Sequence, residues 1–175
     1  MTPLCIACSL GLSSVAGALL VGCASIDYAT PPRHTLPGFT PLMYAAEYNQ
    51  PHVVQLLLDG GADGTKVTTA AGRGHGTGYT ALGIARSRAD SDPGYAETLA
   101  VLRLLCCSAC GVTSTGLTAA TPGVERRLKR CGKCPARGPC AHYCSKECQR
   151  ADWVSWHRGE CAEARRARQA AGTEV

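Results

Sequence analysis

Large aromatic side chains are scarce in this chain of 175 residues. They make up 5% of the sequence, and there is a single Phe. A core built around aromatic anchors is therefore not expected, although an apolar share of 45% is enough to bury a core and argues against global disorder. The length excludes an eight-stranded α/β barrel and leaves room for one compact domain or two small ones.

Signatures of catalysis are also missing. The Gly-rich run 72–78 lacks the Gly-x-x-x-x-Gly-Lys-Ser/Thr order of a phosphate-binding loop, and the sequence shows neither a nucleophile elbow nor a Ser–His–Asp pattern. We therefore expect a protein that is not an enzyme and has no small-molecule substrate. His34, His52 and His75 are expected to be solvated loop residues.

Charge is absent from one long stretch, because no charged residue occurs between Leu4 and Ile26. Such a run is compatible with a signal peptide or a membrane span, and residues 20–23 resemble a lipoprotein cleavage box with Cys23 as the anchor. However, no Lys or Arg precedes the run, and several Ser and Gly residues dilute it. Export as a lipoprotein is therefore the minor alternative, and no membrane association is expected.

A repeated pattern explains this stretch better. Thr2-Pro3-Leu4 recurs as Thr40-Pro41-Leu42 and, weakened, as Thr80-Ala81-Leu82, and each copy places an Ala at the same offset: Ala7, Ala45 and Ala85. In such a unit the Thr caps a short helix that Pro begins, the small Ala lets two helices approach closely, and Gly60-Gly61 ends the second helix.

This pattern resembles the ankyrin repeat, with units at about 2–27, 38–63 and 78–106. The resemblance implies a mainly α-helical fold, a short solenoid of two to three repeats over residues 1–106. The units are spaced by 38 and 40 residues, more than the usual 33, so extra residues are expected in 28–39, 64–79 and 89–98. The chain begins inside its first unit, which suggests a truncated product or a missing N-terminal repeat.

Cysteine is abundant, with twelve residues, eight of them within 107–161. They form short-spaced pairs with one histidine: Cys107/Cys110, Cys131/Cys134, Cys144/Cys148 and His157/Cys161. Eight such ligands suit two tetrahedral zinc ions, and zinc-bound thiolates indicate a reducing compartment. Cys148 and His157 are nine residues apart, roughly 13 Å if helical, so the pairs that contain them must serve different ions.

The segment 143–161, Tyr-Cys-Ser-Lys-Glu-Cys-Gln-Arg-Ala-Asp-Trp-Val-Ser-Trp-His-Arg-Gly-Glu-Cys, resembles the second half of a MYND zinc finger. The resemblance implies a small zinc-stabilised finger over 107–161 with little regular structure, an internal loop at 111–130, and two Zn²⁺ ions held in interleaved sites. Site one is Cys107, Cys110, Cys144 and Cys148; site two is Cys131, Cys134, His157 and Cys161. Residues 162–175 are expected to form a basic tail, either disordered or helical.

Two ligand assignments have alternatives. Cys140 lies in a longer gap than the family usually has and is the alternative to Cys134. Cys106 is the alternative to Cys107, although it continues an apolar helical face and is expected in the core.

The two resemblances together favour an intracellular protein-interaction adaptor, in cytoplasm or nucleus, whose partners are other proteins. Some MYND fingers bind proline-rich peptides through a Gln and a Trp, which correspond to Gln149 and Trp153 here; the alternative is that Trp153 only packs the zinc core.

A second hypothesis is a nucleic-acid-associated transcriptional regulator. Residues 123–175 carry twelve Lys/Arg against six Asp/Glu, a formal charge of +6. Two zinc sites with seven thiolates would remove three of those charges, so we do not favour nucleic acid as the partner.

Overall fold

The computed structural model describes residues 1–69, 78–106, 129–130, 142–143 and 146–152, together with Arg158, Ala162 and Arg166. Its elements are, in chain order, α1 (Pro3–Ser9), α2 (Ser13–Val21), α3 (Pro41–Glu47), α4 (Pro51–Asp59), α5 (Ala81–Ala89), the 3₁₀ turn η1 (Pro93–Tyr95), α6 (Ala96–Leu105), β1 (Lys129–Arg130), β2 (His142–Tyr143) and α7 (Lys146–Asp152).

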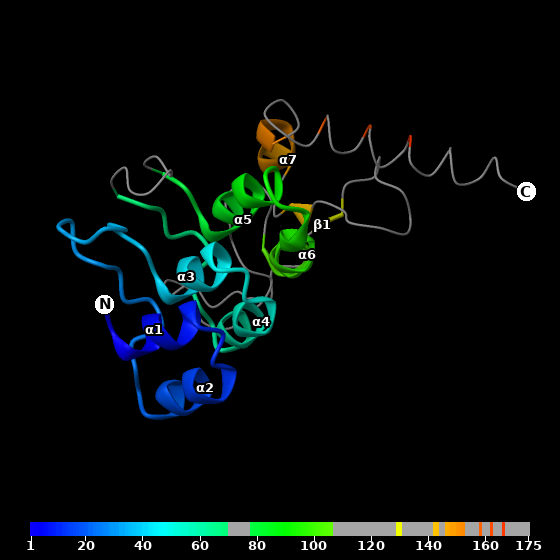
Figure 1. Ribbon diagram of the computed structural model, residues 1–175. Helices are drawn as coiled ribbons and strands as arrows, with labels where there is room; N and C mark the ends of the chain where they lie inside the picture. Colours follow the sequence, from blue (N-terminus) through cyan, green and yellow to red (C-terminus); the bar gives the residue numbers. More distant parts are fainter. Residues whose placement is uncertain are drawn as a thin grey trace, which may run out of the picture.

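The first six helices form three successive antiparallel pairs, α1–α2, α3–α4 and α5–α6 (Figure 1). The first helices of the pairs pack on one another in a row, α1 on α3 and α3 on α5, and the second helices do the same, α2 on α4 and α4 on α6. The result is a two-layered helical stack, as the repeat pattern predicts. The connections between pairs extend to the same side of it (Figure 1).

Each pair begins at the threonine that the sequence predicts as a cap. The Oγ1 atoms of Thr2, Thr40 and Thr80 accept hydrogen bonds from the backbone N–H groups three residues later. Because the first N–H groups of a helix have no partner within it, these bonds fix where α1, α3 and α5 start.

The turn after the second helix also follows the prediction in the second pair. Gly60 ends α4, and Gly61 takes a left-handed backbone with φ 89°. In the first pair the same place is held by Gly22 and Cys23, and Cys23 has φ 63° although it carries a side chain. The first pair therefore places a cysteine where the second uses a glycine.

The core runs between the two helical layers. The repeated alanines, Ala7, Ala45 and Ala85, are all buried, as their small size predicts. The middle pair is the most enclosed: every residue of α3 is buried, and α4 buries Val53, Val54, Leu57 and Leu58. Cys106 belongs to the same core, which agrees with its expected packing role.

Two backbone hydrogen bonds close each connection between pairs at its base, and we call this closed base the neck of the connection. The N–H of Thr30 donates to the Phe39 carbonyl, and the N–H of Gly38 donates back to the Thr30 carbonyl, at 3.0 and 2.9 Å. Thr68 makes the same two bonds with Tyr79 and Gly78. Extra residues in 31–37 therefore extend beyond a closed neck and leave the helix spacing unchanged.

The uncharged N-terminal stretch forms α1 and α2. Among the residues that the structure describes, no helix has the length and apolarity needed to cross a membrane. Cleavage before Cys23 would remove both helices, including the buried Leu4, Cys5, Ala7 and Cys8.

The segment predicted as the zinc finger contains a short strand where a loop was predicted. Lys129–Arg130, expected at the end of the loop 111–130, pair as strand β1 with β2. Such short strands depend on a partner distant in sequence, which local composition does not reveal.

Candidate functional site

Only two of the residues predicted to bind metal or peptide lie within the described part of the chain. Cys148 and Gln149 are half-buried neighbours on α7, whose first turn carries Glu147 and whose last turn carries Arg150. The other predicted residues fall outside the described residues: Cys107, Cys110, Cys131, Cys134, Cys144, Trp153, His157 and Cys161, together with the alternative ligand Cys140.

The strand pair fixes the direction of the chain near two of those cysteines. β1 and β2 are antiparallel, with Lys129 opposite Tyr143 and Arg130 opposite His142, and Tyr143 is buried. Because the strands are antiparallel, the chain leaves β1 after Arg130 and leaves β2 after Tyr143 at opposite ends of the pair.

Within the described ranges, no group of three or more His, Cys, Asp or Glu side chains could hold a metal ion. Since Cys148 is the single predicted ligand in those ranges, the zinc sites stay a prediction.

The helical stack repeats one surface position along its first layer. Leu10, Tyr48 and Arg88 each lie eight residues after the capping threonine of their pair. Leu10 is 63% and Tyr48 47% exposed, while Arg88 is half-buried. We call these three residues the inter-pair row; it gives the first layer an apolar, an aromatic and a cationic side chain in succession.

The cation in this row is already paired. The guanidinium of Arg88 donates through Nε to Glu47 Oε2 at 3.1 Å and through its second nitrogen to Glu47 Oε1. This hydrogen bonding raises the pKa of Arg88. The pair joins α5 to α3 and balances the charge of a carboxylate that α3 buries.

The insertion in the third unit packs against the turn that follows α3. Asn49 takes a left-handed backbone with φ 55°, and its side chain donates to the Gly94 carbonyl at 3.1 Å and accepts from Thr98 Oγ1 at 2.7 Å. The hydroxyl of Tyr95 donates to the Glu47 carbonyl at 2.7 Å. The extra residues of the third unit therefore brace the second.

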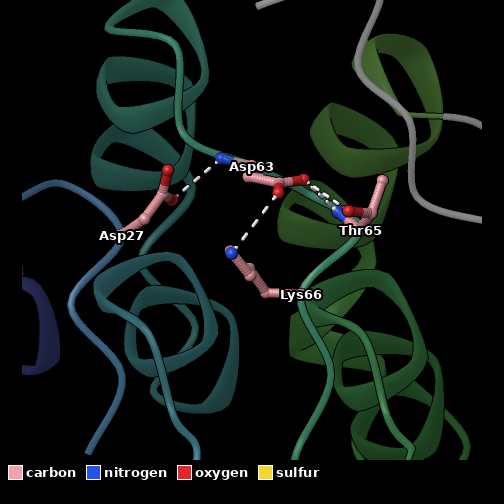
Figure 2. Close-up of polar contacts among 4 residues, drawn as sticks. All are labelled: Asp27, Asp63, Thr65 and Lys66. Carbon is pink, nitrogen blue, oxygen red and sulfur yellow. Dashed lines mark hydrogen bonds and ion pairs between the residues drawn. The ribbon is translucent and has the colours of Figure 1, made fainter. Parts of the chain in front are cut away.

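A polar cluster joins the segments that follow α2 and α4 (Figure 2). The carboxylate of Asp27 accepts from the N–H of Asp63 at 2.9 Å, and Asp63 in turn accepts from the N–H and the hydroxyl of Thr65 at 2.9 and 2.6 Å (Figure 2). Lys66 lies 3.9 Å from the second Asp63 oxygen. Burial raises the pKa of Asp27, partly opposed by its bond from Asp63. These contacts all join members of the cluster to one another, so we assign the cluster a structural role.

The two thiols of α1 are unsuited to nucleophilic chemistry. Cys5 and Cys8 are fully buried, and Thr2 Oγ1 donates to Cys5 Sγ at 3.2 Å. Burial raises the pKa of Cys8 to about 12, so its thiolate is not populated near neutral pH.

His34 differs from its expected place as a solvated loop residue. It is half-buried, its Nδ1 accepts from the N–H of Leu36 at 3.1 Å, and it lies 3.4 Å from the hydroxyl of Tyr44. Burial raises the pKa of Tyr44 to about 12. His52 is exposed as expected, but it lies on α4. The placement of His34 arises because residues 31–37 fold back over α3, which no local pattern in the sequence signals.

Comparison with known proteins identifies repeats in the first part of the stack. Residues 1–68 match the family model described as ankyrin repeats (3 copies). No curated protein matches the chain. Ankyrin repeats are therefore found at residues 1–68, where the structure places the first two helix pairs and the connection to the third, and they indicate a protein–protein interaction module.

Proposed function

We propose that this protein is a non-enzymatic adaptor in which the ankyrin stack binds one protein and a zinc finger of the MYND type, over residues 107–161, binds another. The observation that carries the adaptor role is the ankyrin match over residues 1–68, since stacked repeats provide extended surfaces for protein partners. The inter-pair row Leu10–Tyr48–Arg88 is the part of that surface on which we expect a partner to lie.

The zinc part of the proposal is supported by ligand spacing and chain direction. Cys131 directly follows β1 and Cys144 directly follows β2, and the antiparallel strands send the chain away at opposite ends. Two sulfurs on one zinc ion must lie within about 4 Å of each other, given Zn–S bonds of about 2.3 Å. That requirement favours placing Cys131 and Cys144 on different ions, as in the interleaved arrangement.

The metal would supply most of the stability of this region. A segment of this size with few large apolar side chains has little core, whereas a structural zinc site contributes on the order of 10 kcal/mol to folding. Four protein ligands at each ion leave no open position for water, so both ions would be structural and not catalytic. Thiolates held in this way require a reducing environment, which supports a location in the cytoplasm or nucleus.

Native mass spectrometry of the full chain tests the zinc assignment. We expect two zinc ions per chain, and about one in the Cys148→Ser variant, because that substitution removes a ligand from site one. Cys23→Ser is the matched control: Cys23 is exposed and belongs to neither site, so two ions are expected. A chain that is metal-free and fully folded would contradict the proposal.

Chelation tests whether the two parts depend on the metal differently. We expect a chelator to abolish hydrogen-exchange protection in 107–161 while α1–α6 keep theirs, since the stack buries its own core. Unchanged protection throughout the chain would refute the zinc-dependent finger.

The peptide-binding role of the finger needs its own experiment. We expect an array of proline-rich peptides to capture the zinc-loaded chain, and Trp153→Ala or Gln149→Ala to abolish capture without changing the zinc count. Arg150→Ala, on an exposed position of α7, is the control and should leave capture intact. Loss of capture only together with loss of zinc would favour a packing role for Trp153.

A further inference from the structure

The third helix pair carries charge at two positions where the second pair has apolar core residues. Arg86 lies at the same distance from the capping threonine of its pair as Ala46 does in the second pair. Arg103 lies as far from the start of α6 as Leu58 lies from the start of α4. Ala46 and Leu58 are both buried. A further apolar helix pair is therefore not the neighbour that α5 and α6 are built to receive.

Both arginines are nevertheless buried. Arg86 is 7% and Arg103 9% exposed, whereas Leu104, the next residue on α6, is exposed. A guanidinium group stays charged in proteins, and removing it from water is costly unless a carboxylate balances the charge. Part of this chain therefore covers the two side chains, and it should supply negative charge to them.

The carboxylates of the stack do not meet this need. Residues 1–106 contain seven of them. Each is engaged elsewhere or exposed: Asp27 and Asp63 in the polar cluster, Glu47 with Arg88, Asp59 with Gln55, Asp92 as the cap of η1, and Asp90 and Glu97 in solvent. The balancing carboxylates are therefore expected in the chain after Cys106.

Charge selects one segment of that chain. Residues 107–143 contain one acidic residue against six Lys or Arg, whereas residues 144–163 contain four against three. The four are Glu147, Asp152, Glu160 and Glu163. Helix α7 belongs to this segment, and Figure 1 shows α7 toward the end of the stack that α5 and α6 form, away from α1 and α2. Residues 144–163 therefore match the buried arginines in charge and in their place in the chain.

We propose that Arg86 of α5 and Arg103 of α6 mark a docking surface for residues 144–163 of the same chain, whose carboxylates balance the two guanidinium groups. The docked segment closes this end of the solenoid, which needs a polar covering at its ends to stay soluble. This surface is consequently closed to other proteins, which leaves the inter-pair row for a partner. The proposal goes beyond the adaptor role and does not depend on metal binding.

Arginine labelling of the full, zinc-loaded chain with phenylglyoxal, read by mass spectrometry, tests the cover. Arg86 and Arg103 should react slowly in the unmodified chain. They should react about tenfold faster when the four carboxylates are neutralised together, because the segment then loses its charge partners. The neutralised chain carries Glu147→Gln, Asp152→Asn, Glu160→Gln and Glu163→Gln.

Two controls accompany this variant. Neutralising Glu125 and Glu174, which lie outside the segment, should leave both labelling rates unchanged. Arg88 is held by Glu47 within the stack, so an unchanged rate at Arg88 shows that the stack is still folded. Slow labelling of Arg86 and Arg103 in the neutralised chain would overturn the proposal.

A reciprocal variant keeps the test decisive if the neutralised chain misfolds. Arg86→Ala combined with Arg103→Leu gives the third pair the residues that the second pair buries, so the stack should fold. We expect the amides of α7 to exchange hydrogen about tenfold faster, because the segment is no longer held, while those of α4 keep their rates. Arg33→Ala, at an exposed position, is the control.

Exchange in α7 that stays the same in the reciprocal variant would exclude this surface as the docking site. The zinc content of the same sample, counted by native mass spectrometry, should equal that of the unmodified chain. A failure of docking is therefore told apart from a failure of the zinc assignment, which would appear in the zinc count of both chains.

Discussion

The first and second helix pairs share one template but use it differently. Both begin at a capping threonine followed by Pro-Leu, and both close with a left-handed residue 21 positions after that threonine. Yet α3 is buried over its whole length, while α2 buries a single residue completely. The comparison teaches that the repeat pattern specifies the path of the chain, whereas burial depends on having a neighbour on each side.

Truncation of equivalent leucines should give the largest difference in stability between the two pairs. Leu57→Ala should destabilise the chain by about 2–5 kcal/mol, because Leu57 is fully buried and truncation leaves a cavity. Leu19→Ala, at the equivalent half-buried position, should cost less than half as much in dilute solution. Urea unfolding measures both, and equal costs would show that the first pair is as well packed as the second.

The left-handed turn offers a smaller and more specific test. Gly61→Ala should cost about 1–2 kcal/mol, because Gly61 has φ 89° and a side chain there is strained. Cys23→Gly should stabilise the chain by up to about 1 kcal/mol, because it relieves the strain at φ 63° but adds chain entropy on unfolding. Thermal unfolding of the two variants should move in opposite directions; a destabilising Cys23→Gly would show that the thiol side chain stabilises this turn.

Removing the capping threonines should give a smaller difference in stability between the first and second pairs. Thr40→Ala should cost about 1 kcal/mol, because Thr40 is buried and the N–H of Met43 would lose its partner away from water. Thr2 is half-buried, so water can replace its hydroxyl and Thr2→Ala should cost a few tenths of that. The measurement is again the midpoint of urea unfolding, with Thr35→Ala, an exposed loop position, as the neutral control.

The smallest effect concerns the contact between the pairs at Asp27. Burial raises its pKa in the folded state, so its contribution to stability is complete below its ordinary pKa of 3.8 and is lost as the pH rises through the folded value. Asp27→Asn keeps an oxygen that accepts from Asp63 and removes the buried charge. We expect it to stabilise the chain by about 0.5 kcal/mol at pH 7 and to have no effect near pH 3. A stabilisation that is independent of pH would have another origin.

The sequence predicted those parts of the fold that a residue and its immediate chain neighbours determine, such as helix caps and turns. Thr40, Pro41 and Gly61 each set the conformation of their own neighbourhood, and the structure places each as the pattern indicates. The contact of His34 with Tyr44 could not be predicted in this way, because it depends on how residues 31–37 fold over α3, which no local pattern signals. The same holds for Asn49, whose partners lie 45 and 49 residues later.

The candidate functional sites also differ in whether the sequence alone could predict them. Metal ligands are indicated by residue type and spacing, so the zinc sites could be predicted from the sequence alone, and they stay a prediction. The inter-pair row could not, because exposure at Leu10 or Tyr48 is decided by which elements pack beside them. The pairing of Lys129 with Tyr143, 14 positions later, also depends on a contact that no local pattern signals.

The two hydrogen bonds at Thr30 allow the length of the connection between α2 and α3 to change without changing where the helices lie. Because the two backbone bonds from Thr30 to Gly38 and Phe39 close the segment at its base, doubling its length costs only about 0.6 kcal/mol in loop entropy. Foreign sequence, such as an epitope or a fluorescent reporter, could be grafted at the exposed Pro32–Arg33 without altering helix spacing.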